Sequence, residues 1–97
     1  MKKLRIGGHT YSIKEDPDLP KNQWGLFEAE KLLIRIAPSL HDDVKTMTLL
    51  HEMLHGLFWE YNIQVKNEET VVSSLTTAFA QFIKNNPEFI KAVQSIN

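Results

Sequence analysis

Apolar and polar residues alternate along much of the first forty positions, which is the spacing of β-strands that bury one face. The alternation falls into four stretches, at residues 3–6, 9–15, 24–28 and 32–36. Gly7-Gly8 separates the first two stretches as a turn signal, and the prolines and turn-forming residues of segment 16–22 separate the second from the third. We therefore predict a small antiparallel sheet of three or four strands within residues 1–38.

After residue 38 the apolar residues recur every three or four positions, which is typical of amphipathic helices. A first helix is expected over about residues 41–61, with Ser39 as its N-cap. Its predicted apolar stripe consists of Met47, Leu50, Leu54, Leu57 and Phe58.

Two more helices are expected to follow, one over residues 68–84 with Asn67 as N-cap and a short one over 87–93 that starts at Pro87. The apolar stripe of the longer one consists of Val71, Val72, Leu75, Ala78, Phe79, Phe82 and Ile83. The chain is thus predicted to be one α+β domain of residues 1–97, with a sheet part in 1–38 and a helical part in 39–97.

The composition narrows the class of protein without naming a function. The chain has 97 residues, of which 42% are hydrophobic and 24% charged, and these values are ordinary for a globular protein. There is no cysteine, which excludes disulfides and cysteine-ligated zinc. A net charge of −1 gives no reason to expect a nucleic acid or an anionic membrane as partner. No apolar run follows the basic N-terminus, so we expect no signal peptide and a cytoplasmic protein.

The first predicted helix carries the motif His51-Glu52-x-x-His55. Positions i and i+4 lie one turn apart on one face, so both imidazoles can point at the same ion with the Glu52 carboxylate beside them. Two neutral nitrogen ligands next to a general base form the arrangement of a zinc peptidase. We therefore predict His51 and His55 as zinc ligands and Glu52 as the catalytic base. The alternative interpretation is two surface histidines on an amphipathic helix.

A catalytic zinc usually has a third protein ligand. Glu60 lies on a different face from His55 and is expected to be an ordinary exposed charge. The remaining carboxylates are Glu68 and Glu69, at the start of the second helix. Glu68 falls near the centre of that helix's apolar face and Glu69 about 100° to one side, where packing of the two stripes would bring it beside the histidines. Glu69 is therefore the preferred third ligand, and Glu68 is the alternative.

The motif His51-Glu52-Met53-Leu54-His55, followed by Glu69, Val72 and Leu75, resembles the gluzincin pattern of zinc metallopeptidases. More narrowly, the chain resembles the small ImmA/IrrE-like metallopeptidases of phage, prophage and other mobile elements, and the minimal "minigluzincins". The resemblance spans about residues 32–87 and includes the order of a sheet before helices. It implies a minimal zincin-like fold, Zn²⁺ as the cofactor, and peptide or protein substrates such as regulator proteins.

These observations predict a zinc metallopeptidase in which Glu52 takes a proton from the attacking water and passes it to the leaving amine. Tyr11, His41 and Tyr61 are candidates for stabilising the oxyanion. A peptide substrate would lie extended against an edge strand, either residues 24–28 or residues 32–36.

The competing hypothesis is a non-catalytic module that zinc stabilises and that binds a partner through the short helix 87–93. A helical DNA-binding adaptor is disfavoured because the sequence has no basic stripe. The sequence leaves the substrate, the latency of the enzyme and its oligomeric state open.

Overall fold

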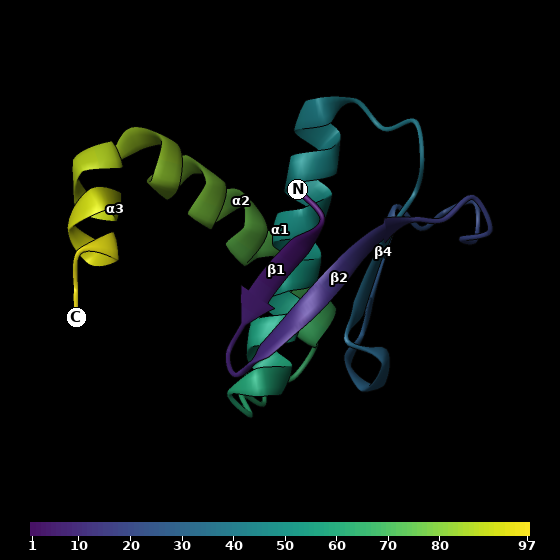
Figure 1. The fold of residues 1–97 in the computed structure, drawn as a ribbon, viewed down its shortest axis with the longest axis horizontal. Helices are drawn as coiled ribbons and strands as arrows, with labels where there is room; N and C mark the ends of the chain where they lie inside the picture. Colours follow the sequence, from purple (N-terminus) through teal and green to yellow (C-terminus); the bar gives the residue numbers. More distant parts are fainter.

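The computed structural model describes residues 1–97 and shows an α+β fold, a four-stranded sheet followed by three helices (Figure 1). The strands are β1 (Lys3–Ile6), β2 (His9–Glu15), β3 (Gly25–Glu28) and β4 (Leu33–Ile36), with a 3₁₀ turn η1 (Ala29–Lys31) before β4. The helices are α1 (Asp42–Glu60), α2 (Glu68–Asn85) and α3 (Pro87–Gln94). The predicted fold class is confirmed. None of the helices combines the length and apolar character that crossing a bilayer requires.

The sheet has the strand order β1-β2-β4-β3 and is mixed, so the expectation of an entirely antiparallel sheet was wrong. Strands β1 and β2 form the predicted antiparallel hairpin through a turn in which Gly7 has φ +59°. Strands β3 and β4 are also antiparallel, but β2 and β4 are parallel. The connection of residues 16–24 is long enough to carry the chain past the position of β4, so that β3 becomes the outer strand and β4 returns between β3 and β2.

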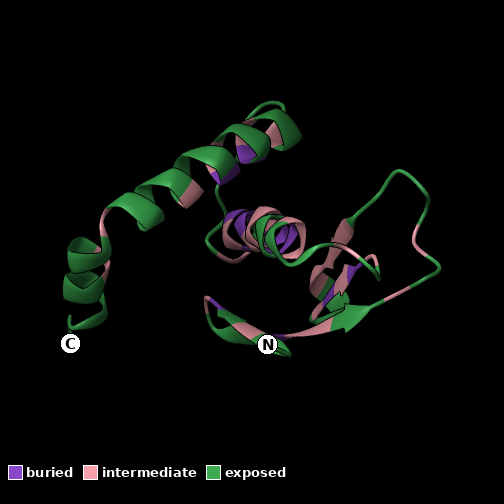
Figure 2. Ribbon diagram, turned by 90° about the horizontal axis from the view of Figure 1, so that it is seen from above, coloured by how far each residue is buried: buried purple, intermediate pink, exposed green.

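Helix α1 lies between the sheet and the first half of α2 (Figure 2). One apolar cluster fills the space between α1 and the sheet, and it contains Ile6, Tyr11, Ile34, Ile36 and Leu49. A second cluster joins α1 to α2 and contains Leu54, Phe58 and Val72. Because α1 is covered on two sides, its buried residues form two faces and not the single predicted stripe. Met47, which that stripe included, is 37% exposed.

The start of α1 differs from the predicted one. Ser39 has φ +67°, a left-handed conformation, and cannot act as the N-cap of a helix that begins three residues later. The N-cap position is occupied by His41, without a side-chain hydrogen bond. After Pro38 the chain turns, and Leu40 packs against the core before the helix begins. Asn67 does precede α2 as predicted, but it also has a left-handed conformation and makes no capping bond.

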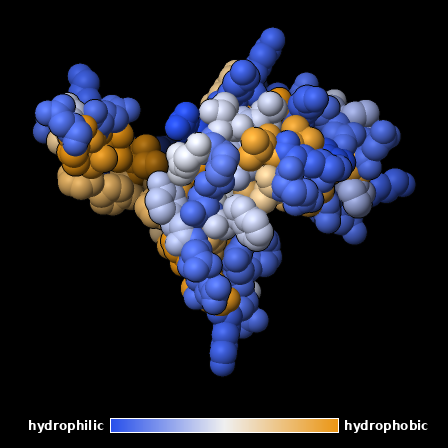
Figure 3. Space-filling model, turned by 60° about the horizontal axis from the view of Figure 1, so that its bottom comes forward, coloured by the Kyte–Doolittle hydropathy of each residue, from blue (hydrophilic) through white to orange (hydrophobic).

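The second half of α2 and the whole of α3 extend away from the rest of the molecule as an arm (Figures 1 and 2). In α2 only Val72 and Thr76 are buried, and α3 has no buried residue. Phe79, Phe82 and Ile83, which belong to the predicted apolar stripe, are 42–44% exposed. Figure 3 shows the apolar side chains gathered on this arm, at the left of the view. The prediction of a packed second helix is therefore confirmed only for its first half.

Glu60, at the end of α1, is not the ordinary exposed charge that we expected. Its side chain is only 7% exposed, and its carboxylate accepts hydrogen bonds from the Tyr11 hydroxyl and from His9 Nδ1, the latter at 2.9 Å. The hydrogen bond from Tyr11, and then the one from His9, lower the pKa of Glu60. Burial, together with the bond to Glu60, raises the pKa of Tyr11 to about 12. These contacts fasten the β1–β2 hairpin to the C-terminal end of α1.

Replacing this carboxylate should make the stability of the protein less dependent on pH. A carboxyl group whose pKa is lowered by folding contributes stability above its ordinary pKa of 4.5 and loses that contribution as the pH falls through the folded-state value. We expect Glu60→Gln to lower the urea midpoint of unfolding at pH 7 and to approach the wild-type midpoint as the pH falls below 4.5.

The matched control is Glu30→Gln, which removes an exposed carboxylate in η1 that makes no ion pair. This control should follow the wild-type midpoint across the pH range. A deficit of Glu60→Gln that stays constant from pH 7 to pH 3 would contradict the proposed role of the Glu60 charge.

Candidate metal centre

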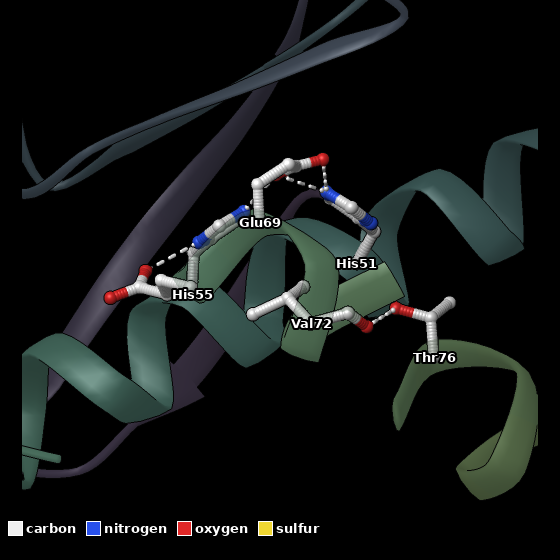
Figure 4. Close-up of polar contacts among 6 residues, drawn as sticks. His51, His55, Glu69, Val72 and Thr76 are labelled. Carbon is white, nitrogen blue, oxygen red and sulfur yellow. Dashed lines mark hydrogen bonds and ion pairs between the residues drawn. The ribbon is translucent and has the colours of Figure 1, made fainter. Parts of the chain in front are cut away.

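Helix α1 presents His51 and His55 side by side, one turn apart, with ring centroids separated by 5.0 Å. The first turn of α2 brings Glu69 across to them (Figure 4). The Glu69 carboxylate lies 3.1 Å from His51 Nε2 and 2.7 Å from His55 Nε2. The three residues predicted as metal ligands are thus brought together by two helices that are separate in sequence.

These three side chains fit a divalent cation. One ligand atom from each lies within 4.8 Å of the other two. Two imidazole nitrogens and one carboxylate oxygen form a common donor set of catalytic zinc sites. The imidazoles are half-buried, and the Glu69 side chain is 69% exposed, so an ion can reach the site from solvent.

The two glutamates at the start of α2 do different things. Glu69 meets the Nε2 atoms of both imidazoles, whereas Glu68 binds the other ring nitrogen of His55, Nδ1, at 2.6 Å. A carboxylate on Nδ1 fixes the orientation of the ring and leaves Nε2 free for a metal. Burial lowers the pKa of His55, but the hydrogen bonds to Glu68 and Glu69 outweigh burial and raise it. Glu68 was predicted as the alternative ligand, and its contact with His55 Nδ1 could not be foreseen from the sequence.

The two imidazoles of α1 influence the ionisation of Glu69 on α2. Burial by itself would raise the pKa of Glu69, but its contacts with His55 and His51 lower that pKa. Glu69 is therefore held in the anionic form that a metal ligand needs.

Glu52 lies on the face of α1 that is turned towards the sheet, next to β3. The residue is 8% exposed, and burial raises the pKa of its carboxyl group above the usual value. The charges of His51 and His55, and a hydrogen bond from the backbone of Phe27, act in the opposite direction. A buried carboxylate with a raised pKa beside a metal site has the properties of a general base.

Gly25 allows β3 to approach Glu52 closely. A Cβ atom at this position would lie 2.8 Å from Thr48 Cγ2, 3.0 Å from Glu52 Cγ and 3.1 Å from Glu52 Oε2. Real Cβ atoms essentially never come as close as the first of these distances, so any side chain here would displace its neighbours. The sequence alone did not indicate this role of Gly25, because the contact depends on how α1 packs on the sheet.

The candidate metal centre lies where two surface hollows meet. A hollow of about 440 Å³ extends on the side of Met47 and Trp24, and one of about 780 Å³ extends on the side of His55 and Trp59. Both hollows are bordered by Gly25, His51 and Glu52. Together they form a cleft that runs alongside the imidazoles of His51 and His55 and has β3 as one wall.

The side chains considered for stabilising an oxyanion do not border this cleft. Tyr11 is buried and bound to Glu60, on the side of α1 that faces the β1–β2 hairpin. Tyr61 is 63% exposed beyond the end of α1, and His41 occupies the N-cap at the opposite end. None of the three lines either hollow.

The site thus combines a three-residue donor set for a divalent cation with a buried carboxylate and an open cleft. No family model, no curated protein and no solved structure matches this chain.

Proposed function

We propose that this protein is a zinc-dependent peptidase that hydrolyses peptide bonds. The observation that carries the proposal is the convergence of His51, His55 and Glu69 beside the buried Glu52 carboxylate, at the junction of two hollows. A site that only stabilises the fold has no need of a buried carboxylate next to the donor atoms, and structural zinc sites are usually closed by four protein ligands.

His51, His55 and Glu69 would hold the zinc ion, with Glu68 orienting His55. Zinc bound there supplies Lewis acidity and lowers the pKa of water from about 15.7 to about 7. The Glu52 carboxylate takes a proton from the attacking water and later gives it to the leaving amine. The raised pKa of Glu52 suits both transfers, because a group whose pKa lies closer to the working pH both accepts and donates a proton readily.

Strand β3 is the strand that supports an extended substrate. Of the two strands considered, β4 is flanked by β2 and β3, whereas β3 has a free edge. The Trp24 carbonyl accepts a hydrogen bond from Ala37 N, at 2.8 Å. Since bonded and non-bonded pairs alternate in an antiparallel ladder, Gly25 and Phe27 turn their backbone groups away from β4. The Phe27 N–H donates to the Glu52 carboxylate, which leaves the Gly25 backbone groups and the Phe27 carbonyl for a substrate at the open edge. A peptide can therefore be added to β3 as a further strand beside Glu52.

The second candidate function is a non-catalytic module that zinc stabilises and that binds another protein. The exposed apolar arm of α2 and α3 favours this alternative, because Phe82 and Phe89 pack edge to face and both remain about half exposed. The arm lies outside the cleft, so partner binding there is compatible with catalysis.

Exchanging the proposed base for its amide should separate catalysis from metal binding. We expect Glu52→Gln to keep one zinc ion per chain and to lower kcat on a peptide substrate by about 100-fold or more, because the amide cannot accept the proton. Metal content is measured by mass spectrometry of the native protein, and turnover is measured with an unstructured peptide mixture. Full activity in this variant would exclude Glu52 as the base.

A side chain at Gly25 should impair turnover without loss of metal. Because the added Cβ displaces Glu52 and Thr48, we expect Gly25→Ala to lower kcat/KM by about 10–100-fold at unchanged zinc affinity. The control is Gly8→Ala, where an added Cβ meets nothing within 4 Å. Equal activity of the two variants would mean that the approach of β3 to Glu52 has no part in catalysis.

The two glutamates of α2 should differ in their effect on zinc affinity. We expect Glu68→Gln to weaken zinc binding by about 10–100-fold, as is usual for a residue that orients a ligand. Glu69→Gln should weaken it more, because a direct ligand is lost. Competition with a chromophoric chelator at pH 7 measures both affinities. The reverse order would make Glu68 the third ligand.

A further inference from the structure

The smaller of the two hollows is lined largely by apolar atoms, although Trp24 and Met47 at its wall are not part of the hydrophobic core. It lies on the Met47 side of the metal centre and borders His51 and Glu52. Its walls are formed by Trp24, Val44, Met47, Thr48, Ser73 and Thr76. The exposed Asp43 also lines it and, apart from Glu52, is its only carboxylate. Trp24 precedes β3, Met47 belongs to α1 and Thr76 to α2, so three separate segments of the fold contribute to it.

The two threonines in this hollow do not offer free hydroxyl groups. Thr48 Oγ1 donates to the Val44 carbonyl at 2.8 Å, and Thr76 Oγ1 donates to the Val72 carbonyl at 2.7 Å (Figure 4). The Thr48 methyl group is turned towards Gly25. Both hydroxyls are occupied within their own helices, so these residues act as apolar walls although the residue type is polar.

Two large apolar side chains at the hollow are left exposed. Trp24 is 57% exposed and Met47 is 37% exposed. The helical spacing of the sequence assigns Met47 to the core, yet in the folded chain it borders the cleft. Covering exposed apolar surface with a ligand is favourable, because it removes that surface from water. Apolar surface next to reactive groups is therefore a candidate binding surface.

The larger hollow differs in character. Its lining includes Asn22, Gln23, Asn62 and Gln64, whose amide groups offer both donors and acceptors. The two sides of the metal centre are therefore unlike each other, one apolar and the other mixed. A substrate that spans both would be selected more strongly for side-chain type on the apolar side.

We infer that the smaller hollow is a specificity pocket that takes a large apolar side chain, such as leucine, methionine or phenylalanine, from one of the two residues that flank the scissile bond. Met47 and Trp24 are the residues that determine this preference. The inference rests on the proposed peptidase function, since the same cleft holds the metal centre. A volume of about 440 Å³ accommodates a side chain of that size together with its backbone.

The test maps cleavage sites on a library of unstructured peptides with the zinc-loaded full-length chain, and reads the products by mass spectrometry. We expect leucine, methionine and phenylalanine to be enriched at one position beside the cut. In Met47→Gln, which keeps the length of the side chain but makes it polar, kcat/KM for the apolar substrates should fall by about tenfold or more. The control is Phe79→Gln, the exchange of an exposed apolar residue on the arm, which should leave the preference unchanged.

A second measurement separates failure of the pocket from failure of the proposed function. Leucine hydroxamate and glycine hydroxamate both bind zinc through the same group, so the ratio of their affinities reports the pocket without any turnover. We expect the leucine compound to bind about tenfold more tightly to the wild type and to lose this advantage in Met47→Gln. If the leucine compound binds more tightly but no peptide is cleaved, the apolar pocket is supported and the peptidase function is contradicted.

Three results would overturn the inference. These are equal cleavage beside every side-chain type, equal affinity for the two hydroxamates, and an apolar preference that survives Met47→Gln unchanged. A preference for basic residues that disappears in Asp43→Asn would also overturn it, because Asp43, at the edge of the hollow, would then determine specificity in place of the apolar wall.

Discussion

The packing of α1 between the sheet and the first turns of α2 is the constraint on which the candidate site depends. One face of α1 carries Glu52 against β3, and the adjoining edge carries the two imidazoles to α2. Val72, which is fully buried, packs against Leu54 and Phe58 and sets the position of the α2 N-terminus. If α2 were displaced, His51 and His55 would remain together, but the carboxylates of Glu68 and Glu69 would leave them.

The parts of the site that lie on one element could be predicted from the sequence. The spacing of His51, Glu52 and His55 on a helix fixes their relative positions before any tertiary contact forms. The preference for Glu69 came from helical phase, and the structure places that residue against both Nε2 atoms. The strand positions were also predictable, since alternation of apolar residues marks a half-buried strand whichever neighbours it has.

The parts that depend on contacts between elements could not be read from the sequence. The role of Gly25 requires knowing that β3 lies against Glu52, and the contact of Glu68 with His55 Nδ1 requires the orientation of a ring. The parallel pairing of β2 with β4 follows from the path of a loop, which residue spacing does not specify. Met47 was assigned to the core because periodicity reveals an apolar face but not whether another element covers it.

The central claim is that a divalent ion is held jointly by α1 and the first turn of α2. The most direct measurement is a crystal structure of the zinc-loaded chain, with anomalous diffraction recorded on both sides of the zinc absorption edge. The account predicts one zinc peak about 2.0–2.2 Å from the Nε2 atoms of His51 and His55 and from the Glu69 carboxylate. A fully folded chain without a peak there, or with zinc bound only by other residues, would contradict it.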